Sequence, residues 1–180
     1  MYRKLILCAA LTTIASTAHA QLMTTGNKPF SFGAAAGASV PISDLSDFNN
    51  TGFNGTLILG INTPALPMSF RVEGAYDSFG DKRGNGDVHS TSLTGNVVFE
   101  FPSGSTVRPY LIGGVGLYNT GASNGAGYSS GSSNDFGVNV GGGFTIPLGG
   151  FNSFVEARYH RIATSSVSTQ FIPIVFGVMF

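Results

Sequence analysis

The sequence is poor in charge, has no tryptophan and contains one cysteine. Lysine, arginine, aspartate and glutamate together make up 10% of its 180 residues, whereas a typical soluble domain carries about 25%. Beyond the N-terminal segment, no apolar run approaches the roughly 20 residues that a transmembrane helix needs. The low charge therefore argues against an ordinary soluble domain, and the short apolar runs exclude a helical membrane protein.

The first 20 residues have the organisation of a secretory signal peptide. Arg3 and Lys4 precede a short apolar run, and an Ala-His-Ala cleavage site ends at Ala20. We therefore expect export and cleavage near Ala20. The mature chain should then consist of a periplasmic tail at residues 21–29 and one domain at residues 30–180.

The only cysteine, Cys8, lies inside this predicted signal peptide. The mature chain should therefore have no disulfide and no thiol chemistry. Removal of Arg3 and Lys4 would leave seven basic residues against nine acidic ones (7 − 9), a formal charge of about −2. This balance gives no indication of nucleic-acid binding.

What the sequence does contain is alternation of apolar residues with small or polar ones, which is typical of β-strands. The composition fits this pattern, with 26 glycines and 12% aromatic residues. The alternation predicts eight strands, each long enough to cross a membrane at a tilt: Phe30–Ile42, Phe53–Asn62, Ser69–Phe79, Thr91–Phe101, Val107–Tyr118, Asp135–Leu148, Phe151–Arg161 and Gln170–Phe180.

The last of these strands has one uniformly apolar face and ends on an aromatic residue. That face consists of Ile172, Ile174, Phe176, Val178 and Phe180. This stretch resembles the final strand of a bacterial outer-membrane barrel. In such barrels the final strand typically ends in Phe and serves as the recognition signal for barrel insertion. From this stretch alone, the last buried strand of a soluble sandwich is the alternative.

The connections between the predicted strands alternate in length. Short turns lie at residues 63–67, 102–106 and 149–150, and longer polar loops lie at residues 43–52, 80–90, 119–134 and 163–169. Outer-membrane barrels have short periplasmic turns and long extracellular loops, whereas a soluble sandwich has no reason to sort its loops in this way. We therefore predict an all-β, eight-stranded antiparallel transmembrane β-barrel.

Three stretches resemble the porin-family, OmpA-like group of outer membrane protein β-barrels: RPYLIGGVGLYN, FVEARYHRI and FIPIVFGVMF. The resemblance covers residues 30–180 and implies a bacterial outer-membrane location. It also implies contact with outer-membrane lipid and with the barrel-assembly machinery through the last strand. The group is functionally mixed, so the resemblance does not fix an activity. The peptidoglycan-binding half of larger OmpA proteins is not expected after Phe180.

In this arrangement the polar faces of the strands line the lumen. The expected inward charges form a balanced set, with a histidine above them: Arg71, Glu73, Glu100, Arg108, Glu156, Arg158 and His160. Four of these residues lie on neighbouring strands and could form one cross-strand cluster: Arg71, Glu73, Glu100 and Arg108. We place Asp77 higher on its strand, near the outer rim. Because buried charges must be paired, the set favours a salt-bridge network that plugs the barrel. A polar path for small ions, open when the network rearranges, is the alternative.

Other chemistry finds little support in the sequence. Three histidines, one of them in the signal peptide, are too few for a zinc cluster. Asp81, Asn85 and Asp87 could contact calcium, but a solvated turn is the better interpretation, because Arg83 stands where a ligand is wanted. The glycine runs at residues 113–116 and 141–143 precede no predicted helix, so we interpret them as room for large lumen side chains and not as phosphate loops.

We also tested the sequence against small barrels that modify lipid A. Lipid A deacylases carry a His-x-Ser pair near the end of strand seven and a downstream Glu. Here Arg161 and Ile162 follow His160, and no acidic residue follows Glu156. We therefore expect no enzyme activity, no cofactor and no metal, and we expect a monomer. The predicted role is structural or surface-interacting with an unidentified partner; a narrow porin-like channel is the alternative, and an envelope lipid-modifying enzyme a remote one.

Overall fold

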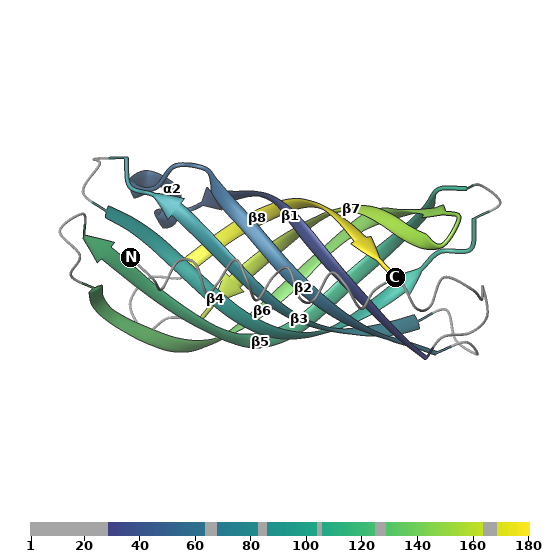
Figure 1. The fold of residues 1–180 in the computed structure, drawn as a ribbon. Helices are drawn as coiled ribbons and strands as arrows, with labels where there is room; N and C mark the ends of the chain where they lie inside the picture. Colours follow the sequence, from purple (N-terminus) through teal and green to yellow (C-terminus); the bar gives the residue numbers. More distant parts are fainter. Residues whose placement is uncertain (1–28, 64–67, 83–85, 104–105, 125–128, 164–168) are drawn as a thin grey trace, which may run out of the picture.

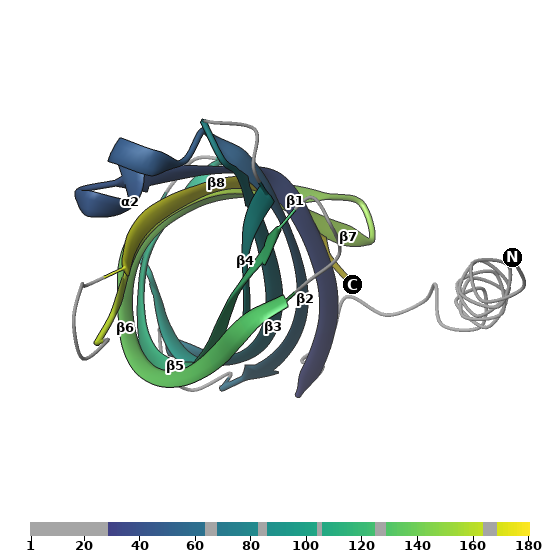
Figure 2. The ribbon, with the colours of Figure 1, turned by 90° about the vertical axis from the view of Figure 1, so that its left-hand side faces the viewer.

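The computed structural model describes residues 29–63, 68–82, 86–103, 106–124, 129–163 and 169–180. Eight strands, each antiparallel to its neighbours, form a barrel that closes where β1 pairs with β8 (Figures 1 and 2). This confirms the predicted fold. The strands are β1 (Phe30–Ile42), β2 (Gly52–Asn62), β3 (Met68–Gly80), β4 (Gly86–Glu100), β5 (Arg108–Asn124), β6 (Ser129–Leu148), β7 (Phe151–Ile162) and β8 (Thr169–Met179).

The barrel is apolar outside and polar inside, because the side chains of a strand alternate between its two faces. On β2, for example, Leu57 points outward and is exposed, whereas its neighbours Thr56 and Ile58 are buried. Among the described residues, 26 large hydrophobic side chains are exposed, far more than a soluble barrel could leave in contact with water. The fold therefore presents apolar residues on its outer wall and encloses polar residues, together with apolar ones such as Phe79 and Phe171, in its lumen.

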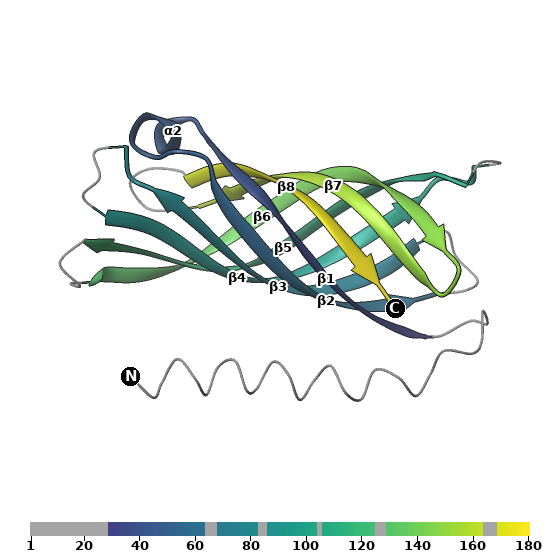
Figure 3. The same cartoon turned by 45° about the horizontal axis from the view of Figure 1, so that its top comes forward.

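The two ends of the barrel differ (Figures 1 and 3). The connections β2–β3, β4–β5 and β6–β7 lie at one end, here called the turn end, together with the C-terminus. The tightest of them is Gly149–Gly150, where φ is +30° and +142°, values that suit glycine because it has no Cβ. The opposite end, the loop end, carries a short helix, α2 (Asp44–Phe48), in the β1–β2 connection.

The structure corrects the predicted loops in two ways. The first long loop contains α2, which was not predicted. The second and third are shorter than expected, since β4 begins at Gly86, β5 continues to Asn124 and β6 begins at Ser129. Sheet that projects beyond a membrane needs no apolar face, so backbone pairing continues through the Ser-, Asn- and Gly-rich sequence without alternation. Within the described residues, no helix has the length and apolar character needed to cross a membrane.

Candidate functional site

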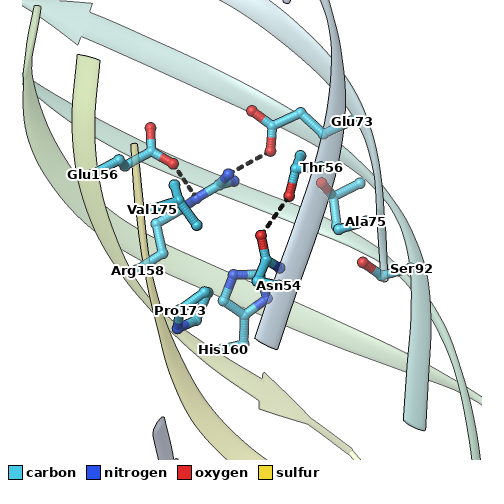
Figure 4. Close-up of a pocket in the computed structure, with 11 residues that line it drawn as sticks. Asn54, Thr56, Glu73, Ala75, Ser92, Glu156, Arg158, His160, Pro173 and Val175 are labelled. Atoms are coloured by element: carbon cyan, nitrogen blue, oxygen red, sulfur yellow. Dashed lines mark hydrogen bonds and ion pairs between the residues drawn. The ribbon is translucent and has the colours of Figure 1, made fainter. Parts of the chain in front are cut away.

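Four charged side chains from opposite walls of the barrel meet in the lumen. Arg158 Nη2 lies 2.5 Å from Glu73 Oε2, and Arg158 Nε lies 2.6 Å from Glu156 Oε1 (Figure 4). Arg71 Nη1 donates to Glu156 Oε2 at 3.1 Å. We call these four residues the lumen cluster. All four are at least nine-tenths buried, so each charge depends on its partners for compensation.

The lumen cluster forms because β3 and β7 stand four places apart in a ring of eight strands. Arg71 and Glu73 are two residues apart on β3, as are Glu156 and Arg158 on β7, so each pair points inward from its own strand. The interior of an eight-stranded barrel is just wide enough for side chains to fill. Long side chains from opposite walls therefore reach each other across it.

The expected cross-strand cluster of Arg71, Glu73, Glu100 and Arg108 is wrong. Arg108 Nη1 lies 3.4 Å from Glu100 Oε2 in a separate pair, and both side chains are 38% exposed. The register explains the separation: on β4, Asn96 stands beside Arg71 and Thr94 beside Glu73, whereas Glu100 is the last residue of its strand. The set of six charges therefore divides into a buried group of four and a half-exposed pair.

Two further polar residues, Asp77 and His160, are buried outside the ion pairs. The prediction placed Asp77 near the outer rim, but it is 2% exposed and accepts hydrogen bonds from Ser39 Oγ and from Asn54 Nδ2. His160 is buried and points inward, as expected, with Nδ1 2.9 Å from Tyr118 Oη. His160 therefore forms a hydrogen bond with Tyr118 and takes no part in the ion pairs of the lumen cluster.

Aromatic side chains fill much of the remaining lumen; the sequence analysis expected large side chains beside the inward glycines but missed the inward phenylalanines. The Arg71 guanidinium lies 5.2 Å from the ring centroids of both Tyr110 and Phe154, a favourable contact for a cation. A second group, here called the aromatic cap, consists of Phe79, Tyr118, Ile162 and Phe171, against which Leu45 of α2 packs. The alternation contained the signal, because Phe79, Phe154 and Phe171 fall on the inward positions of their strands.

Glycines make room for the inward tyrosines. A Cβ at Gly143 would lie 2.7 Å from the Tyr110 ring, and one at Gly137 would lie 2.6 Å from the Tyr118 ring. Such distances are too short for real atoms, so both rings lie flat only because these positions lack a side chain. The prediction that inward glycines provide space is confirmed at these two sites.

A small cavity and a larger one lie in the lumen. The smaller, of about 10 Å³, borders Glu73, Arg158 and His160 (Figure 4). The larger, of about 80 Å³, lies toward the turn end, where Arg71, Asn62 and Asn152 contribute to its wall. The lumen is therefore nearly filled at the lumen cluster and leaves more room at the larger cavity.

The described residues contain no group of three His, Cys, Asp or Glu side chains placed to hold a metal ion. Of the three residues considered for calcium, Asn85 lies outside the described part of the chain. Asp81 forms an isolated bridge with Asn49 of the first loop. The described geometry thus gives no support to a metal site in the second loop.

The family is settled by a match that spans nearly the whole chain. Residues 6–180 match the family described as outer membrane protein beta-barrel domain. The chain belongs to this family. It is a small bacterial outer-membrane β-barrel whose lumen contains buried salt bridges. Among curated proteins, no sequence matches the chain.

Solved structures of outer-membrane barrels share the fold. Neisserial surface protein A is similar with a TM-score of 0.71 and 21% identity, over 86% of this chain and 97% of that one. Ail, the attachment invasion locus protein of Yersinia pestis, has a TM-score of 0.51 and 20% identity, over 84% and 97%. The outer membrane enzyme PagL has a TM-score of 0.50 and 18% identity, over 83% and 98%. At such identities the likeness establishes the fold and leaves the activity open.

The terminal strand of this outer-membrane barrel holds the two ends of the sheet together. Phe180 N donates to Phe32 O at 2.7 Å, and Phe32 N donates to Phe180 O at 3.1 Å. The Phe180 ring lies 5.7 Å from that of Phe151 on the outer surface. The apolar face of β8 points outward, as its alternation predicted. Its role as an insertion signal stays a prediction, as does the signal peptide, which lies outside the described residues.

Proposed function

We propose that this protein is a non-enzymatic outer-membrane barrel with a plugged lumen, and that it acts through its structure and its loop end. The observation that carries the proposal is the position of Arg158. Its guanidinium contacts carboxylates on both β3 and β7, so it bridges the full width of the barrel. The cavity beside it, at about 10 Å³, is of the size of one water molecule.

A second barrier supports the plug. The aromatic cap lies in the lumen toward the loop end, where α2 contributes Leu45 to it. An ion that crossed the barrel would first have to displace these apolar side chains and then break the ion pairs of the lumen cluster. Both steps are costly, because they expose apolar surface and separate buried charges.

The absence of enzyme activity is part of the proposal. The outer membrane enzyme PagL shares the fold, but His160, the histidine on β7 here, is unsuited to attack a membrane lipid. His160 is buried in the lumen beside Tyr118 and stacks on Phe171, with ring centroids 5.0 Å apart. A base that hydrolyses lipid would have to reach the outer wall.

The names of two structural relatives support a role at the cell surface. One is a surface protein of Neisseria and the other an attachment invasion locus protein. We propose by analogy that the loop end, with α2 and the extended β4–β5–β6 sheet, faces the exterior and meets a partner there. Lipid would contact the apolar outer wall, the assembly machinery would recognise the final strand, and the barrel would act as a monomer.

A narrow channel for ions or small polar solutes is the second candidate. The observation that favours it is the cavity of about 80 Å³ toward the turn end, which extends inward as far as Arg71. In a channel, this cavity would be a vestibule and the lumen cluster would be the gate. Rearrangement of the four charges would then have to open a path past the aromatic cap.

Single-channel recording of the refolded mature chain in a planar bilayer separates the two candidates. The informative variant is the charge-balanced double substitution Glu73→Ala, Arg158→Ala, which removes one acid and one base and leaves the Arg71–Glu156 pair. The matched control is Glu100→Ala, Arg108→Ala, which removes the half-exposed pair. For a plug made of the lumen cluster and the aromatic cap we expect no openings in the parent, the control or the lumen variant, because the aromatic cap stays in place in all three. Openings that appear only in the lumen variant would identify the lumen cluster as a gate. Steady openings in the parent would favour the channel.

A further inference from the structure

The larger cavity of the lumen, of about 80 Å³, reaches from exposed residues at the turn end to a buried arginine. In its wall, Asn62 and Phe180 are exposed, whereas Arg71 and Phe154 are more than nine-tenths buried. One water molecule needs only about 10–15 Å³ of such space. The cavity therefore has room for a molecule of several non-hydrogen atoms.

The contacts of Arg71 leave part of its guanidinium group to this cavity. Its Nη1 donates to Glu156 Oε2 at 3.1 Å, and the rings of Tyr110 and Phe154 each lie 5.2 Å from its central carbon. An arginine has five N–H donors in one plane, and within the described residues its hydrogen bonding engages Nη1 alone. Because Arg71 borders the cavity, a molecule bound there has donors available at the buried end.

Glu100 places the opposite charge in the wall of the same cavity. It is the last residue of β4 and lies further toward the turn end than Asn96, the residue that stands beside Arg71. Its Oε2 lies 3.4 Å from Arg108 Nη1, and its side chain is 38% exposed. Arg108 is outside the cavity wall. The cavity therefore has a cation at its buried end and a carboxylate nearer the turn end.

We propose that this cavity binds a small zwitterion, a molecule that carries both a carboxylate and an ammonium group. The carboxylate accepts hydrogen bonds from the Arg71 guanidinium, whose planar fork of donors suits two oxygen atoms. The ammonium group donates to Glu100. The rest of the wall includes hydroxyl and amide side chains, which can both donate and accept: Ser31, Ser69, Thr145 and Asn152.

The charges of the wall select a zwitterion over a simple ion. The formal charges of the lumen cluster cancel, and so do those of Glu100 and Arg108. An anion would gain Arg71 but face Glu100, whereas a cation would gain Glu100 but face Arg71. A molecule with separated charges satisfies both ends and adds no net charge to a partly desolvated site. This site ends at the lumen cluster, so it requires no conduction through the barrel.

Saturation-transfer NMR of the refolded mature protein in detergent micelles tests the proposal with three probes of similar size. β-Alanine carries both charges, propionate carries only the carboxylate, and propylamine carries only the ammonium group. We expect β-alanine to bind about tenfold more tightly than either singly charged probe, because each of those lacks one charge-assisted contact. Equal affinities of the three probes, or no binding of β-alanine, would overturn the proposal.

A matched pair of substitutions tests the position of the site. Glu100→Gln removes the carboxylate of the wall and should weaken β-alanine binding about tenfold. Asp135→Asn removes a carboxylate from β6 toward the loop end and should leave the affinity unchanged. Both residues lie outside the lumen cluster, so both variants should fold. An unchanged affinity in Glu100→Gln, or an equal loss in Asp135→Asn, would contradict the assignment.

A crystal structure of the mature protein soaked with β-alanine gives the position directly. We expect density for the probe in the larger cavity, with its carboxylate at Arg71 and its ammonium group at Glu100. Density for water alone in this cavity would overturn the proposal, and so would β-alanine in the reverse orientation.

Discussion

Substitution of Arg158 by methionine should be among the most destabilising single changes in this barrel. Methionine keeps most of the apolar stem of the side chain, so packing is largely preserved and the charge is removed. Glu73 then loses its ion-pair partner at 2.5 Å, and Glu156 keeps its contact with Arg71 and the hydrogen bond from Tyr110 Oη. Removal of one partner from a buried ion pair typically costs about 3–5 kcal/mol, because an uncompensated charge stays buried.

The barrel provides its own control in the pair near the turn end. Arg108 and Glu100 lie 3.4 Å apart but are each 38% exposed, and such solvated pairs contribute only about 0–1 kcal/mol. Arg108→Met therefore removes the same chemical group, also from a salt bridge, at little cost. The comparison isolates burial as the cause of the difference.

Urea unfolding of the refolded protein in lipid vesicles, followed by far-ultraviolet circular dichroism, measures both effects. Circular dichroism suits this chain because it has no tryptophan to report fluorescence. With a slope of about 2 kcal/mol per molar urea, a loss of about 4 kcal/mol lowers the midpoint by about 2 M. Arg108→Met should move the midpoint by less than about 0.5 M on the same scale.

Two results would refute the reasoning. Equal midpoints for the two variants would mean that the lumen cluster is as well solvated as the half-exposed pair. A double variant Glu73→Met, Arg158→Met as unstable as the sum of its single variants would mean that the two residues do not interact, because contacting residues give non-additive losses.

Three further predictions concern the outer wall, the packing of the lumen and assembly. Val140→Lys places a charge on the outward face and should cost about 2–4 kcal/mol near the bilayer midplane, lowering the folded fraction in vesicles, whereas Val140→Leu should not. Gly143→Ala should push against the backbone oxygen of Val155 and the Tyr110 ring and cost about 1–3 kcal/mol by overpacking. Gly74→Ala, where an added Cβ meets nothing within 4 Å, should leave the urea midpoint unchanged. Phe180→Ala should reduce the amount of assembled barrel in cells but allow refolding in detergent; equal losses in both would argue against a recognition role.

The eight strands and their two faces could be read from the sequence because membrane strands obey a strict local rule. Leu57, Leu93 and Val140 face outward and Thr94 and Asn139 inward, as their alternation indicated. This rule applies only to the part of each strand that lies in the membrane. Beyond it neither face must be apolar, so the extensions of β4, β5 and β6 left no periodic signal and were predicted as loops.

The depth of the inward residues was harder to predict. Asp77 was expected at the rim because it stands close to the predicted end of its strand, yet Ser39 and Asn54 from two other strands enclose it. The inward phenylalanines were missed for a related reason. An apolar residue on an inward position looks like an interruption of the pattern until the neighbouring strands show that it belongs to a packed cap.

The sequence by itself determined the fold class, the number of strands, the face on which each charge lies and the membership of an outer-membrane family. These properties depend on residues a few positions apart, which alternation and turn chemistry encode locally. Only the tertiary structure decided which charges meet. Arg71 and Glu156 are 85 residues apart in the chain, and they pair because closure of the ring sets β3 against β7. Strand tilt and register, which fix that meeting, are properties of the closed barrel and not of any one strand.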